Sequence, residues 1–289
     1  MTEEKLYNVS LPYPGRDKKQ IWIYVPSHID GEKFPTVYMT DGQNLFDEDS
    51  TPYGSWKVAD AVKNEMKNGS SGVVIVGIDN SGKMRENELT PKSIGKMMTE
   101  NEKFAAEMSD EMYDDLIEIN KDFYKTFSAP EAEIFDDFLV NTVMPYVEEN
   151  FPVISGKNSR AVCGSSMGGL FAFYEAVAHS DIFSFSGVFS PAFLLFKESE
   201  ILGWLMGKMT DDMPYLYVYT GGGDILEEII CKTAESTYDM ITECGYPYDR
   251  SSIVILPENK HNEAAWREIY PDFLHTFLSK YKQANELLK

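Results

Sequence analysis

The chain has 289 residues, of which 43% are apolar and 25% charged, and its formal net charge at pH 7 is -21. A field of this sign repels phosphate backbones and anionic membranes, so we expect neither nucleic-acid nor membrane partners. The three cysteines are widely spaced and form no CxxC pair, which argues against a disulfide framework or a zinc site.

The length and apolar content predict one large domain over residues 1–289. The N-terminal residues lack the basic and apolar regions of a signal peptide, and no run of about 18 apolar residues occurs. We therefore expect a cytoplasmic protein, with a secreted protein whose signal peptide has been removed as the alternative. The sequence leaves open a homo-oligomer.

Eight short β-rich runs, separated by helical patterns, predict an α/β architecture with a mostly parallel sheet of about eight strands. The first two runs predict an antiparallel start, and the later ones are nearly continuous apolar runs. In chain order, the predicted strands are 6–11, 20–25, 35–40, 73–78, 160–164, 185–190, 215–220 and 252–257.

Residues 80–130 form a polar stretch, rich in Met and Lys, that contains no predicted strand. A structureless loop of this length is unusual in a compact domain, so we interpret the stretch as an inserted cap or lid. A solvated irregular connection is the alternative.

A glycine–serine stretch, Gly164-Ser165-Ser166-Met167-Gly168, matches G-x-S-x-G between a strand-like and a helix-like run. In a nucleophile elbow, the residues two before and two after the serine must be small because the turn is tight. Gly164 and Gly168 have these places around Ser166, which makes Ser166 the candidate nucleophile. The alternative is a turn whose serine caps the following helix.

A serine hydroxyl needs a base, and only three histidines follow Ser166 in the chain. His179 lies 13 residues along the next helix, about 20 Å away at 1.5 Å per residue. His275 lies in an amphipathic terminal run, where a structural histidine is more common. His261 follows the strand 252–257 in a polar loop before a helix, and it is the candidate base.

The candidate acid is Asp224, because it alone among the aspartates between Ser166 and His261 directly follows a buried-looking strand, in YLYVYTGGGD. The chain order Ser, Asp, His is that of the α/β-hydrolases. An aspartate that caps the next helix is the alternative, and Glu227 and Glu228 are fallback acids. For the oxyanion, the sequence suggests the amide of Met167 and one from the turn TDGQNLF, after the strand 35–40.

Taken together, VYMTDGQNLFD, the following Trp56, GSSMGG, YTGGGD and KHNEAAWRE resemble the putative-esterase family, from about residue 20 to residue 280. This family of α/β-hydrolases includes enterochelin-type, feruloyl and acetyl-xylan esterases, S-formylglutathione hydrolase and mycolyltransferases. The resemblance implies an α/β-hydrolase fold and no cofactor or metal. It also implies site roles, namely nucleophile Ser166, acid Asp224, base His261 and oxyanion donors Gln43 and Met167.

We therefore expect a serine carboxylesterase that acts on a small-acyl, carbohydrate or phenolic ester, with a small molecule or oligosaccharide as substrate. Asp41, Arg85 and Trp266 are candidate substrate contacts. Trp266 fits the family's HxxxxW pattern, which packing also explains, and Arg85 has a surface position as its alternative. An acyltransferase with the same residues, and a catalytically silent binding module, are the alternative functions.

Overall fold

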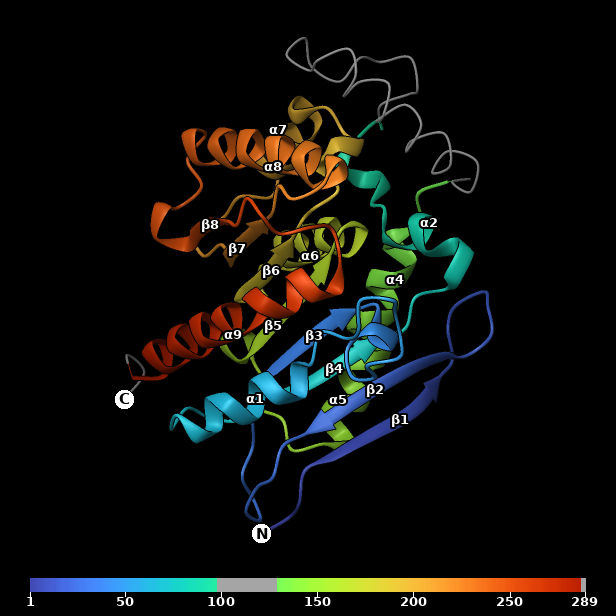
Figure 1. Cartoon of the computed structure of the whole chain (residues 1–289), viewed down its shortest axis with the longest axis vertical. Coiled ribbons are helices and arrows are strands. Elements are labelled where there is room, and N and C mark those ends of the chain that lie inside the picture. Colours follow the sequence, from blue (N-terminus) through green and yellow to red (C-terminus); the bar gives the residue numbers. More distant parts are fainter. Residues whose placement is uncertain (98–128, 287–289) are drawn as a thin grey trace.

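An eight-stranded sheet runs through the middle of the molecule (Figure 1). The computed structural model describes residues 1–97 and 129–286. The strands are β1 (Lys5–Leu11), β2 (Lys19–Val25), β3 (Thr36–Thr40), β4 (Val74–Ile78), β5 (Arg160–Ser165), β6 (Phe185–Phe189), β7 (Tyr215–Thr220) and β8 (Ser251–Ile255). Each begins and ends within two residues of a predicted strand, so the predicted sheet is confirmed.

The strand order in the sheet is β1-β2-β4-β3-β5-β6-β7-β8. β3 to β8 run parallel to their neighbours, whereas β2 pairs antiparallel with both β1 and β4. The chain leaves β3 toward β4 on one side and later returns to β5 on the other side. In open α/β sheets, ligands bind at such a switch point, beyond the carboxyl ends of the strands.

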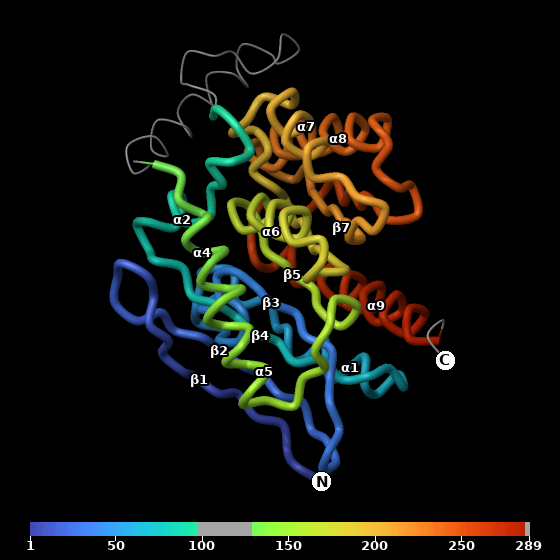
Figure 2. The backbone as a smooth tube through the Cα atoms, turned by 180° about the vertical axis from the view of Figure 1, so that it is seen from behind, coloured from blue at the N-terminus to red at the C-terminus, as the bar shows by residue number. Residues whose placement is uncertain are grey.

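Helices cover both faces of the sheet, which explains why β3, β4 and β6 are buried along their whole length. The described helices are α1 (Val58–Lys67), α2 (Arg85–Leu89), α4 (Ala132–Phe138), α5 (Met144–Asn150), α6 (Met167–Ala178), α7 (Glu198–Met206), α8 (Ile225–Glu243) and α9 (Glu263–Glu286). Helices α1 and α9 pack on one face, and α4, α5 and α6 on the other (Figures 1 and 2). None of these helices is long and apolar enough to cross a membrane.

The described ends of the predicted lid, residues 80–97 and 129–130, lie against each other. The amide of Ala129 donates to Asn87 Oδ1 (2.9 Å), and the amide of Glu131 donates to the Asn87 carbonyl (2.8 Å). Residues 98–128 lie outside the described residues, so the lid and the division of the chain into one domain with an insertion stay predictions.

Candidate active site

The turn between β5 and α6 gives Ser166 an unusual backbone conformation, with φ 59° and ψ −119°. Only a few per cent of residues other than glycine have positive φ, and a strained serine at this place is the feature that the elbow motif predicts. A main-chain hydrogen bond fixes the turn to the neighbouring strand, because the Ser166 amide donates to the Phe189 carbonyl at the end of β6 (3.0 Å). Ser166 is partly exposed, whereas Ser165 and Met167 are buried.

The glycines beside Ser166 leave no space for a side chain. A Cβ at Gly164 would lie 2.4 Å from Thr40 Oγ1 and 2.5 Å from the Gly168 carbonyl oxygen. A Cβ at Gly168 would lie 2.1 Å from the same Thr40 oxygen. The small residues therefore let the elbow pack against the end of β3, and they also let the two arms of the turn approach each other.

We expect Gly164→Ala to lower the free energy of unfolding by about 1–3 kcal/mol, because the added methyl group overpacks a rigid backbone contact. Any activity that depends on Ser166 should fall with it, since the elbow must shift. Gly203 is a matched control, because it is exposed on α7 and no atom lies within 4 Å of an added Cβ. Gly203→Ala should raise stability by about 0.5–1 kcal/mol. Urea unfolding measures both, and equal effects would contradict the prediction.

The imidazole of His261 contacts Glu227, with His261 Nδ1 2.5 Å from Glu227 Oε2. Glu227 lies in the first turn of α8, and its carboxylate is fully buried. The other carboxylate oxygen, Oε1, accepts hydrogen bonds from Ser190 Oγ (2.5 Å), Thr220 Oγ1 (3.1 Å) and the Gly221 amide (2.6 Å). This arrangement satisfies a buried carboxylate that would otherwise be costly to hold inside the protein.

Burial alone would raise the pKa of Glu227, but the hydrogen bonds from His261, Ser190 and Gly221 outweigh it and hold the pKa below its ordinary value. Glu227 is therefore ionised at neutral pH and can only accept hydrogen bonds. In neutral His261, the proton then has to be on Nδ1, which leaves Nε2 as the basic nitrogen.

Asp224, the acid that the sequence predicts, does not contact the imidazole. Its Oδ1 accepts from the Glu227 amide (2.9 Å), so it is the N-cap of α8, and its Oδ2 accepts from the main-chain amide of His261 (2.9 Å). The helix-capping alternative thus describes Asp224 correctly. The fallback residue Glu227 is the carboxylate that meets the ring, and Glu228 has no such contact among those seen in the described residues.

Trp266 supports this pair from the side. Its ring packs edge-to-face on His261 with centroids 5.1 Å apart, and its Nε1 donates to Ser190 Oγ (3.0 Å). Ser190 has a positive φ of 40° and donates onward to Glu227. Because Ser190 directly follows Phe189, whose carbonyl holds Ser166, the loop after β6 links the elbow to the His261–Glu227 pair.

The turn after β3 places the Gln43 amide near the carboxyl end of the sheet. Asp41 has a left-handed conformation (φ 55°), and the next three residues form a 3-10 helix (Gly42–Asn44). A Cβ at Gly42 would lie 2.6 Å from the main chain of Gly77, so the turn packs directly on β4. Met167 is the first residue of α6, where amides have no partner within the helix. The amides of Gln43 and Met167 thus begin helical turns after neighbouring strands.

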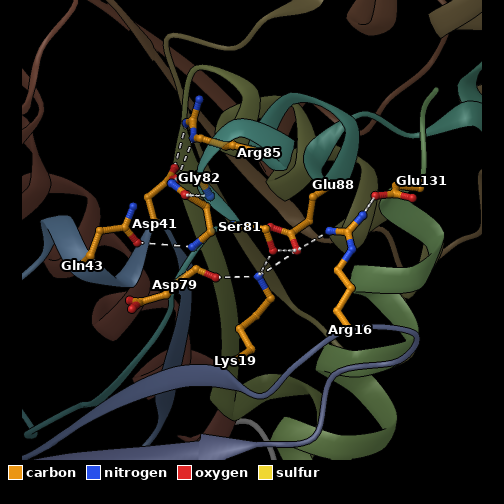
Figure 3. A network of polar contacts seen from close by, with 11 residues as sticks. Arg16, Lys19, Asp41, Gln43, Asp79, Ser81, Gly82, Arg85, Glu88 and Glu131 are labelled. Atoms are coloured by element: carbon orange, nitrogen blue, oxygen red, sulfur yellow. Dashed lines mark hydrogen bonds and ion pairs between the residues drawn. The ribbon is translucent and has the colours of Figure 1, made fainter. Parts of the chain in front are cut away.

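A partly buried ion pair, between the buried Asp41 and Arg85, whose side chain is 22% exposed, holds the turn after β3 in place (Figure 3). Arg85 Nε and Nη2 donate to the two carboxylate oxygens of Asp41 (2.6 and 2.8 Å), and Nη2 also approaches the Ser165 carbonyl (3.3 Å). Burial works to raise the pKa of Asp41, but the Arg85 charge and hydrogen bonds outweigh it, so the pKa lies below its ordinary value. Asn80 Nδ2 donates to Asp41 Oδ1 as well (2.6 Å).

A second buried pair continues this network away from the elbow (Figure 3). Lys19 Nζ lies 2.7 Å from Glu88 Oε1, and it also donates to the Asp79 carbonyl (2.8 Å). Glu88 accepts from the amide and hydroxyl of Ser81 (3.0 and 2.8 Å). The loop after β4 is therefore fixed between β2 and α2.

Removing the guanidinium should be costly. We expect Arg85→Ala to lower the free energy of unfolding at pH 7 by about 3–5 kcal/mol, because it leaves the buried Asp41 charge unpaired. The depressed pKa of Asp41 means that the pair stabilises above the unfolded-state pKa and loses its effect as the pH falls through the folded-state pKa. The difference in free energy of unfolding between Arg85→Ala and the wild type should therefore become smaller at acid pH. Urea unfolding at several pH values measures this difference.

The control for this prediction is Lys63→Ala, which removes an exposed pair with Asp60. It should cost at most about 1 kcal/mol. An Arg85→Ala protein as stable as Lys63→Ala would show that the Asp41 pair contributes little.

The three predicted substrate contacts all have protein partners. Asp41 and Arg85 bind each other, and Trp266 is 5% exposed behind His261. Their contact with a substrate stays a prediction, and Arg85, with 22% of its side chain exposed, is partly buried and not a plain surface arginine. The signal for Glu227 was present in the sequence as D-x-x-E at the start of a helix, a pattern typical of a capped first turn.

The sequence of the chain matches a known family. The family model described as putative esterase matches residues 15–268. A search of curated proteins found no match.

Solved structures with the same fold cover nearly the whole chain. A CE1 ferulic acid esterase from Anaeromyces mucronatus, in complex with ferulic acid, has a TM-score of 0.63 and 18% identity over 97% of this chain and 93% of its own. An IroE-like serine hydrolase from Shewanella oneidensis has a TM-score of 0.69 and 18% identity, covering 94% and 80%. The siderophore hydrolase EstB from Aspergillus nidulans has a TM-score of 0.64 and 17% identity, covering 97% and 96%.

Proposed function

The chain belongs to the putative esterase family, and from this premise we propose that it hydrolyses carboxylic esters through an acyl-Ser166 intermediate. Membership confirms the expected family and the expected enzyme class, a serine esterase. The nucleophile, the base, the acid and the substrate are our proposals. The proposed nucleophile, base and acid rest mainly on the buried Glu227–His261 pair. This pair leaves His261 Nε2 basic at the end of the sheet where the elbow lies.

In the proposed first step, His261 Nε2 takes the proton of Ser166 Oγ as this oxygen attacks the ester carbonyl carbon. The carbonyl oxygen becomes an oxyanion, which accepts hydrogen bonds from the amides of Gln43 and Met167. The imidazolium then gives its proton to the leaving alkoxide, and the acyl group stays on Ser166. Glu227 holds the ring in the right tautomer and stabilises its positive charge.

In the second step, His261 takes a proton from water, which attacks the acyl-enzyme carbonyl carbon. The tetrahedral intermediate collapses to the carboxylic acid product, and the imidazolium returns the proton to Ser166 Oγ. In this scheme His261 carries every proton, and water is the only reactant besides the ester.

For the substrate, we propose a short ester of a phenolic acid or carbohydrate. A hollow lined by Leu6, Trp22 and Phe46 adjoins Gln43, and aromatic side chains of this kind suit a planar ring. Structures of the same fold come from proteins named as a ferulic acid esterase and a siderophore hydrolase, which supports trying aromatic esters first.

Two measurements test the proposal. A fluorophosphonate probe followed by peptide mass mapping should place the adduct on Ser166, and an adduct on Ser165 would contradict the nucleophile. A panel of feruloyl esters, acetylated xylan oligomers, catecholate siderophores and triglycerides should show the highest kcat/KM for one of the first three. A preference for long-chain triglycerides would contradict the substrate class.

A further inference from the structure

A second group of ionisable side chains lies at the opposite end of α6 from the elbow, between α6 and α4. It consists of Asp136 on α4 and of Glu175 and His179 at the far end of α6. One nitrogen or oxygen atom from each residue lies within 4.8 Å of the other two. Glu175 and His179 are four residues apart, so the helix places them on one face, a spacing by which helices present paired metal ligands.

Glu175 is the unusual member. It is fully buried, and neither carboxylate oxygen has a hydrogen-bond partner within the described part of the chain. Buried polar groups are normally hydrogen-bonded, and an ionised carboxylate without a partner is costly in the interior. Burial and the nearby Asp136 charge raise the pKa of Glu175 well above its ordinary value. The lone carboxyl group therefore lacks the positive partner that would make it stable as an anion.

Three of the other buried glutamates in the described residues have a basic partner, and a fourth, Glu263, accepts hydrogen bonds from Asn44 and Thr51. Glu88 contacts Lys19, Glu227 contacts His261, and Glu65 contacts His275 and Ser70. Around Glu175, the ionisable neighbours are the His179 imidazole, whose Nε2 contacts Asp136, and the Asp136 carboxylate, which cannot balance a negative charge. Both of these are also metal ligands.

We propose that Asp136, Glu175 and His179 bind one divalent first-row transition cation, such as Zn²⁺. One imidazole nitrogen and two carboxylates suit these ions better than Ca²⁺, which prefers six to eight oxygen ligands. His179 Nε2 and Asp136 Oδ1 are 2.7 Å apart, close enough to share one ion after a small adjustment. The side chains of Asp136 and His179 are 16% and 27% exposed, so an ion can reach the site from solvent.

Outer contacts of the cluster support the same role. Tyr174 Oη donates to the second oxygen of Asp136 (3.2 Å), and partners of this kind orient metal-binding carboxylates. Phe135 and Phe171 pack edge-to-face (ring centroids 5.0 Å apart) and hold α4 against α6 beside the cluster. Because His179 lies about 20 Å along α6 from Ser166, the bound ion joins two helices and takes no part in ester hydrolysis.

Zinc uptake by the tag-free, full-length protein, first treated with EDTA, tests the proposal. We expect one Zn²⁺ per chain by elemental analysis after gel filtration, and a higher melting temperature with zinc than without it. Calorimetric titration of the EDTA-treated protein with Zn²⁺ at pH 7 should fit one binding site per chain. Mn²⁺ is tested in the same way.

Variants separate this site from adventitious binding. Glu175→Gln and His179→Gln should each lose stoichiometric uptake, and Tyr174→Phe should bind about 10-fold more weakly. His275→Gln, which removes an exposed imidazole that contacts Glu65 on another part of the molecule, should bind as the wild type does. If circular dichroism shows that Glu175→Gln does not fold, the zinc uptake of His179→Gln decides whether the cluster binds the ion. The proposal is overturned if neither Zn²⁺ nor Mn²⁺ binds at one per chain, or if His179→Gln still binds like the wild type.

Discussion

Replacing Ser166 with alanine should lower kcat for p-nitrophenyl acetate by about 10³-fold or more, while the protein stays folded. The variant keeps the oxyanion amides and the Glu227–His261 pair, but it has no oxygen to form the acyl-enzyme. The residual rate would come from binding and oxyanion stabilisation alone. Steady-state kinetics measure the loss, and the pre-steady-state burst of acyl-enzyme formation, where the wild type shows one, should disappear.

Ser165→Ala is the matched control for this change. Ser165 is the neighbouring serine at the end of β5, but it is only 4% exposed. The residues two before and two after it are Cys163 and Met167, so it lacks the flanking glycines of an elbow. Its loss should change kcat by a few-fold at most. Equal rates for the wild type and Ser166→Ala would favour the silent binding module over the enzyme.

Replacing Glu227 with glutamine should lower kcat by about 10³- to 10⁴-fold, the range found for the acid of other triads. An amide in this position can donate as well as accept, so it no longer fixes the proton on His261 Nδ1 and does not stabilise the imidazolium. The shape of the side chain is kept, and its carbonyl oxygen can still accept from Ser190 and Gly221. The loss should therefore appear in kcat and not in the melting temperature.

Asp224→Asn distinguishes the two candidate acids. Because Asp224 caps α8 and holds only the main chain of His261, its replacement should cost at most about 1 kcal/mol of stability and less than about 10-fold in kcat. The ranking of the two variants is the test. If Asp224→Asn were the more damaging, the acid would be Asp224, as the sequence predicts.

The strands and the elbow were predictable because their signals are local. A nearly continuous apolar run between turn residues indicates a strand that is covered on both faces of the sheet. Glycines two residues before and two after Ser166 indicate a tight turn. Both depend on residues close together in the chain. His261 could be chosen in the same way, because the other histidines after Ser166 lie within helical patterns.

Local signals could not decide which carboxylate contacts His261, because the D-x-x-E pattern contains both candidates. Asp224 and Glu227 are one helical turn apart, and either carboxylate can follow the strand β7 toward the histidine loop. The longer Glu227 side chain is held at the end of the sheet because Ser190, Thr220 and the Gly221 amide all donate hydrogen bonds to its Oε1. Ser190 comes from a different strand end, so the decisive donor is distant in sequence. The Asp41–Arg85 pair was missed for the same reason.

The guanidinium of Arg85 contacts both the Asp41 carboxylate and the Ser165 carbonyl, so a single side chain supports the turn of Gln43 and the base of the elbow. Proteins open locally in cooperative units whose members share contacts. We therefore expect the turn after β3, the elbow and the loop of Asn80 to open together as one such unit. Slow amide hydrogen exchange in that loop would report that the reactive centre is assembled, even when no substrate is present.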